Sequence, residues 1–109
     1  MDMRIDRVLC LGVVLFISQH ALAKLPFTDE GFGGLEGTVD FCSQADAKSA
    51  AKYQQKKQAL LKNLPEKEVA AARTSQDYRR GYDSMTTRLR VLPNDEALGM
   101  CRAFLEETK

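Results

Sequence analysis

The chain has 109 residues, with 16 basic and 15 acidic side chains, so its formal net charge is only +1. A nearly neutral chain does not attract nucleic acid or an anionic membrane through bulk charge, and we expect no nucleic-acid partner. One histidine, three cysteines and no tryptophan restrict the catalytic and metal sites that the chain can form.

The first 23 residues have the three-part pattern of a secretory signal peptide. Arg4 and Arg7 precede the ten-residue apolar run Val8–Ile17, and Ala21-Leu22-Ala23 follows as a small-residue cleavage site. The apolar run is shorter than the roughly 18 residues that a membrane-spanning helix needs. We therefore predict a signal peptide at residues 1–23, cleaved after Ala23, and a periplasmic or secreted protein without a transmembrane helix. The alternative is an uncleaved N-terminal anchor.

Cleavage would remove both His20, the single histidine, and Cys10. Without histidine, the exported chain cannot form a Ser-His-Asp triad, a Cys-His pair or a histidine metal site. We predict no catalytic residue, metal site or cofactor, and no enzymatic activity. The two remaining cysteines, Cys42 and Cys101, predict one disulfide, because export permits the bond. Two free thiols or an intermolecular bond are the alternatives.

Residues 24–37 contain four glycines, at positions 31, 33, 34 and 37. Because glycine at this density weakens helix and strand alike, we predict a flexible arm. The segment Gly31–Gly37 has the composition of a phosphate-binding loop, but such a loop needs a preceding strand, and no strand pattern precedes it.

Residues 38–109 predict a small helical domain. Thr38 is suited to begin a short helix through Cys42, and Asp46 is a favourable N-cap for the next helix. The pattern Leu-Pro-x-x-Glu occurs twice, at residues 64–68 and 92–96, and proline in the first turn followed by acidic residues marks a helix start. The predicted helices after the first are Ala47–Lys62, Pro65–Val91 and Pro93–Glu106. Thr74-Ser75 can divide the long one by capping a new helix.

Apolar residues recur at helical spacing in each of these segments. The fold class is therefore all-α: a compact bundle of three or four helices, packed up and down, behind a flexible Gly-rich N-terminal arm. Tyr78 and Tyr82 continue the apolar stripe of their helix, so we expect both rings in the core, with their hydroxyls reaching polar partners at its edge. The predicted core also contains Tyr53, Leu60, Leu61, Leu64, Val69, Met85, Leu89, Ala97, Leu98, Cys101, Phe104 and Leu105.

Two clusters of basic residues are candidates for contact with a partner. Residues 47–62 carry five lysines and no acid, and residues 79–90 carry four arginines against one aspartate. From these clusters we take Lys52, Lys56, Arg79 and Arg80 as possible contacts with an acidic protein or an envelope component. The alternative is that these charges only cover solvated helix faces.

We expect a monomeric exported protein that binds other proteins or serves as a structural component of the envelope. Two further functions stay open. One is the binding of a small molecule between the helices. The other is carboxylate-based hydrolysis, for which the candidate acids are Asp77, Asp83, Asp95, Glu96, Glu106 and Glu107.

Overall fold

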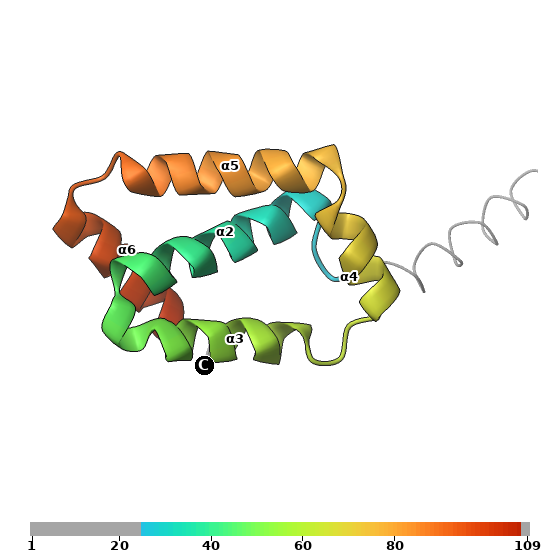
Figure 1. The fold of residues 1–109 in the computed structure, drawn as a ribbon, viewed down its shortest axis with the longest axis horizontal. Coiled ribbons are helices and arrows are strands. Elements are labelled where there is room, and N and C mark those ends of the chain that lie inside the picture. Colours follow the sequence, from blue (N-terminus) through green and yellow to red (C-terminus); the bar gives the residue numbers. More distant parts are fainter. Residues whose placement is uncertain (1–24, 108–109) are drawn as a thin grey trace, which may run out of the picture.

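The computed structural model describes residues 25–107, which form five α-helices and no β-strand (Figure 1). None of these helices is both long and apolar enough to span a membrane. The helices confirm the all-α prediction, although the described residues contain five helices rather than three or four. They are α2 (Asp29–Ala45), α3 (Ala50–Leu61), α4 (Glu66–Arg73), α5 (Gln76–Arg90) and α6 (Asn94–Glu107), with a 3₁₀ turn, η1 (Ala47–Ser49), before α3.

The predicted Gly-rich arm is wrong from Asp29 onward, because these residues form the first half of α2, the central helix of the fold. Thr28 is the N-cap, and its Oγ1 accepts a hydrogen bond from the Gly31 N–H at 3.0 Å. Asp29 and Glu30 place negative charge in the first turn, where the helix dipole favours it. Tertiary contacts therefore outweigh the cost of four glycines, which is about 1 kcal/mol each relative to alanine.

The glycines allow α2 and α5 to approach each other closely. A Cβ at Gly33 would lie 2.0 Å from the carbonyl oxygen of Tyr78, and a Cβ at Gly81 would lie 2.0 Å from that of Glu30. Each glycine thus faces the backbone of the other helix. The two helices run side by side in the same direction (Figure 1). Tyr78 contacts Glu36, and Tyr82, one turn later on α5, contacts Asp40, one turn later on α2.

α3 lies on the opposite side of α2 from α5 and runs antiparallel to α2. The up-down prediction therefore describes the α2–α3 pair but not the parallel α2–α5 pair. The predicted division of the long helix is confirmed, because Ser75 is the N-cap of α5 and its Oγ accepts from the Tyr78 N–H. Asp46 precedes η1, but its side chain caps no helix; its carboxylate instead accepts from the Tyr53 hydroxyl at 3.0 Å.

The apolar core consists of two clusters, one towards each end of α2. The first contains Phe32, Val69 and Ala72, with Leu61, Leu64 and Tyr78 packed against it. The second contains Val39, Cys42, Tyr53 and Cys101, with Phe104 and Leu105 against it. Most of the predicted core positions are buried or half-buried, whereas Leu60 is exposed.

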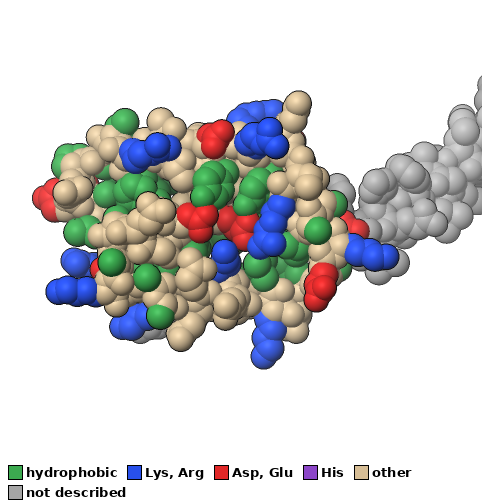
Figure 2. All heavy atoms as spheres, in the orientation of Figure 1, with side chains coloured by type: hydrophobic (Ala, Val, Ile, Leu, Met, Phe, Trp, Pro, Cys, Tyr) green, Lys and Arg blue, Asp and Glu red, His purple; other side chains and the backbone are tan. Residues whose placement is uncertain are grey.

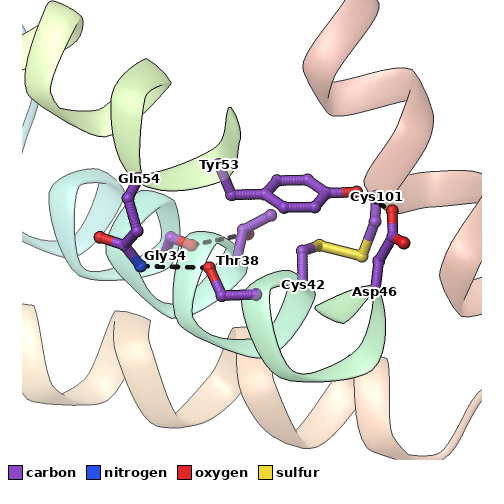
Figure 3. Close-up of a disulfide and its surroundings, with 8 residues drawn as sticks. Gly34, Thr38, Cys42, Asp46, Tyr53, Gln54 and Cys101 are labelled. Atoms are coloured by element: carbon purple, nitrogen blue, oxygen red, sulfur yellow. Dashed lines mark hydrogen bonds between the residues drawn. A yellow bond between two sulfur atoms is a disulfide. The ribbon is translucent and has the colours of Figure 1, made fainter. Parts of the chain in front are cut away.

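The predicted disulfide between Cys42 and Cys101 is confirmed, with a Cα–Cα distance of 5.5 Å (Figure 3). Both cysteines are fully buried beside the ring of Tyr53. The bridge ties the C-terminal half of α2 to the middle of α6. Lys56 of α3 adds a second attachment, because its Nζ donates to the carbonyl oxygens of Phe104 and Leu105 at 2.8 and 2.5 Å.

Candidate functional site

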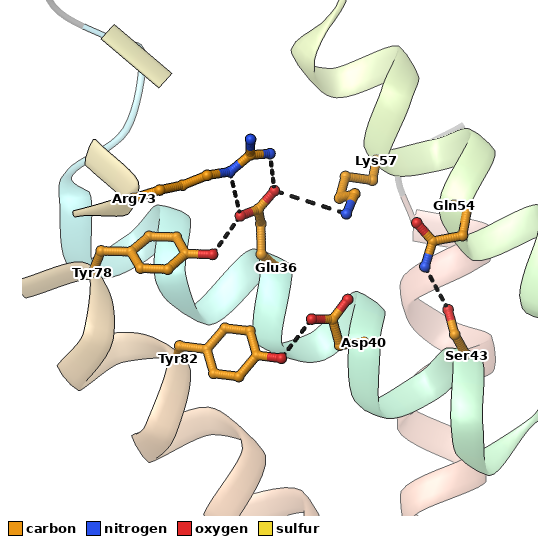
Figure 4. A network of polar contacts seen from close by, with 8 residues as sticks. All are labelled: Glu36, Asp40, Ser43, Gln54, Lys57, Arg73, Tyr78 and Tyr82. Carbon is orange, nitrogen blue, oxygen red and sulfur yellow. Dashed lines mark hydrogen bonds and ion pairs between the residues drawn. The ribbon is translucent and has the colours of Figure 1, made fainter. Parts of the chain in front are cut away.

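Glu36, in the middle of α2, is the centre of a network of hydrogen bonds and ion pairs (Figure 4). Arg73 of α4 binds its carboxylate in bidentate fashion, with Nε 3.0 Å from Oε1 and a terminal nitrogen 2.6 Å from Oε2. The Tyr78 hydroxyl of α5 also donates to Oε1, and Lys57 Nζ of α3 lies 4.0 Å from Oε2. One carboxylate therefore connects four helices, between the two apolar clusters.

Glu36 is only 4% exposed, yet its environment favours the ionised form. Burial by itself would raise the pKa of Glu36, but the hydrogen bonds from Arg73 and Tyr78, with the positive charges of Arg73 and Lys57, outweigh it and lower that pKa. The hydrogen bond to Glu36 in turn raises the pKa of Arg73. Because both carboxylate oxygens accept hydrogen bonds from protein groups, Glu36 serves as a structural anchor.

Each of the three tyrosines of the chain donates a hydrogen bond from its hydroxyl to a carboxylate. Tyr78 binds Glu36, Tyr82 binds Asp40 one turn further along α2, and Tyr53 binds Asp46. The hydrogen bond to Asp40, with a smaller contribution from burial, raises the pKa of Tyr82 to about 12. Burial and the bond to Asp46 raise the pKa of Tyr53 to about 12 as well. Burial and the bond to Glu36 also raise the pKa of Tyr78. The expected polar partners of Tyr78 and Tyr82 are thus present.

These contacts predict that no tyrosine of the folded protein ionises near pH 10, the ordinary value for a phenol. A raised folded-state pKa stabilises the fold fully below about pH 10, and this stabilisation is lost as the pH rises through the folded-state values. Absorbance of the phenolate, recorded together with far-UV circular dichroism, should therefore show ionisation only well above pH 10, as helix is lost. Protein unfolded in urea is the control and should titrate near 10; a step near 10 in folded protein would contradict the contacts.

The structure places the four predicted partner residues on two separate helices. Lys52 and Lys56 lie on α3, whereas Arg79 and Arg80 lie on α5, on the other side of α2 (Figure 1). Arg80 is paired with Asp77 at 2.9 Å, and Lys56 is bound to the carbonyls of α6. The four residues therefore do not form one surface.

Lys52 and Lys56 belong instead to a groove between α3 and α6, with a volume of about 760 Å³. Its cations are Lys48, Lys52, Lys56 and Arg102, and its acids are Asp46 and Glu106. Within residues 25–107, Lys48, Lys52 and Arg102 form no ion pair. We call this feature the basic groove.

The acids predicted for hydrolysis are dispersed over exposed positions of α5 and α6. The residues that the structure does bring together, Glu36 and Asp40, were not among the predicted site residues. Figure 4 shows aromatic and basic side chains around them, and Figure 2 shows acidic side chains at the centre of one face of the molecule, among hydrophobic and basic ones. Glu36 and Asp40 are both on α2, which the prediction divided into an arm and a short helix. The helical spacing of Phe32, Leu35, Val39 and Cys42 was the signal that could have revealed them.

Residues 25–107 contain no cluster of three or more metal-binding side chains. Comparison of the chain with protein-family models, curated proteins and solved structures gives no match. A functional assignment therefore depends on the chemistry of the side chains themselves.

Proposed function

We propose that the chain is an exported protein-binding module that holds an acidic segment of a partner in the basic groove between α3 and α6. The observation that supports this most directly is the set of cations in that groove without an ion-pair partner among residues 25–107: Lys48, Lys52 and Arg102. The signal-like N-terminus and the internal disulfide support export.

The charge balance of the groove favours an acidic partner. Glu36 is compensated by Arg73 and Lys57, and the exposed Arg80 is compensated by Asp77. In the basic groove, four cations face two acids, and Asp46 is already bound to Tyr53. An acidic partner would therefore gain attraction from uncompensated charge, without first breaking an ion pair of the described chain.

The groove also offers apolar surface to a partner. Ala59 and Leu105 line it together with the aliphatic stems of the lysines. Lys48 lies in η1 and Lys52 in the first turn of α3, four residues later, and Arg102 of α6 lines the same groove. Such an arrangement suits a peptide that carries both carboxylates and apolar side chains, rather than a simple anion.

The test measures binding of a fluorescent glutamate-rich peptide by anisotropy at low and high ionic strength. We expect saturable binding that weakens as salt is raised, because exposed charges are screened. The variant Lys48→Gln/Lys52→Gln/Arg102→Gln should weaken binding about tenfold or more, if each cation contributes about 0.5 to 1 kcal/mol.

The matched control is Arg79→Gln/Arg80→Gln/Arg88→Gln, which also removes three exposed cations, all of them on α5 and outside the groove. This variant should bind almost as the unaltered chain does. Equal losses in the two variants would show attraction by overall charge and would contradict a specific groove. Absence of saturable binding to the unaltered chain would contradict the proposal altogether. Lys56 is left unchanged, because its contacts with α6 would confound the result.

A further inference from the structure

A second groove lies where the C-terminal halves of α2 and α5 meet the start of α6. It has a volume of about 490 Å³, within the usual range for small-ligand sites. Apolar side chains form much of its wall: Phe41, Leu89, Leu92 and Ala97. Its polar groups are Asp40 and Gln44 from α2, Tyr82, Thr86 and Arg90 from α5, and Asn94 from α6.

Asp40 is the acid of this groove, and no cation of residues 25–107 pairs with it. Its Oδ2 accepts a hydrogen bond from the Tyr82 hydroxyl, and residues 25–107 supply no hydrogen bond to its Oδ1. Glu36, one turn away on the same helix, has Arg73 and Lys57 beside it. The negative charge at Asp40 is thus uncompensated and borders a groove.

The end of α2 adds to this negative potential. α2 ends at Ala45, which lines the groove, whereas Arg88 and Arg90 offset the carbonyl end of α5. The carbonyl end of a helix carries partial negative charge. The last turn of α2 contains no basic side chain to offset it. Arg90 is directed back along α5, where its guanidinium donates to the backbone oxygen and the hydroxyl of Thr86 at 3.3 Å each.

We propose that this groove binds a small organic amine with an apolar body, the ammonium group at Asp40 and the body against Phe41, Leu89 and Leu92. The ammonium would donate a hydrogen bond to Oδ1 of Asp40. The rings of Phe41 and Tyr82 favour a cation through their π-faces. The inference is independent of the basic groove, because the two grooves share no lining residue.

The experiment titrates hexylamine and hexanoate, which have the same apolar chain and opposite charge, into the full chain. Isothermal calorimetry and amide chemical shifts report binding. We expect saturable binding of hexylamine, with shifts confined to the groove, and much weaker binding of hexanoate. Asp40→Asn should weaken hexylamine binding about tenfold or more, because it removes a charge-assisted hydrogen bond. The substitution preserves an oxygen that can accept from Tyr82.

Asp83→Asn is the matched control, since it removes an exposed aspartate of α5 that does not line the groove. It should leave hexylamine affinity within about twofold. A second variant, Ala45→Phe, fills the groove from an exposed position and should abolish binding even if Asp40→Asn fails to fold. Equal affinity for hexylamine and hexanoate, equal effects of Asp40→Asn and Asp83→Asn, or no saturable binding would each overturn the proposal.

Discussion

Replacing Gly33 or Gly81 with alanine is expected to lower the free energy of unfolding by about 3 kcal/mol or more. The new methyl group would lie 2.0 Å from a backbone oxygen of the facing helix, which is far inside van der Waals contact. A side chain could rotate away, but a backbone carbonyl within a helix cannot, so α2 and α5 must separate. Their separation would also disturb the contacts from Tyr78 and Tyr82 to Glu36 and Asp40.

The matched control is Gly99→Ala in α6, where a Cβ would meet no atom within 4 Å. Since alanine favours a helix by about 1 kcal/mol relative to glycine, this substitution should stabilise the protein or leave it unchanged. Urea unfolding followed by far-UV circular dichroism compares the three variants. If Gly33→Ala and Gly99→Ala shift stability in the same direction, the close approach of α2 and α5 is wrong.

Loss of the Cys42–Cys101 disulfide is the second large effect. The bridge joins residues separated by 59 positions. The chain-entropy model attributes about 4 kcal/mol to a loop of that size. Small domains have total stabilities of about 5 to 15 kcal/mol, so the double variant Cys42→Ala/Cys101→Ala should lose a large part of its stability. The alanines also leave buried volume unfilled beside Val39 and Tyr53.

We expect α6 to be affected first, since only Ala97 and Cys101 are buried along it and Met100 is 52% exposed. Hydrogen exchange should then show faster exchange in α6 than in α2 or α5. A reducing agent should lower the stability of the unaltered chain and leave the double-alanine variant unchanged. Free thiols at Cys42 and Cys101 in protein purified without a reducing agent, detected by mass spectrometry, or a loss below about 1 kcal/mol in the double variant, would contradict this account.

Local signals in the sequence determined the helical class, most helix boundaries and the disulfide. The Leu-Pro-x-x-Glu starts and the Thr74-Ser75 break act within one turn of backbone, and the helices begin and end near them. The pairing of Cys42 with Cys101 was predicted from the two cysteines that would remain after the expected cleavage of residues 1–23. The polar partners of Tyr78 and Tyr82 could be expected because a buried phenol needs one, although the sequence did not identify them.

Only the tertiary structure decided the state of residues 29–37 and the arrangement of the charged residues. By local propensity, four glycines disfavour a helix, but glycine is also the residue that lets two helix backbones touch, and that benefit requires α5 to be present. The same applies to charge: Glu36 is compensated by Arg73, 37 residues away, and Lys52 and Arg102 line the same groove although they are far apart in the sequence. These arrangements depend on how the helices pack, which local sequence patterns do not determine.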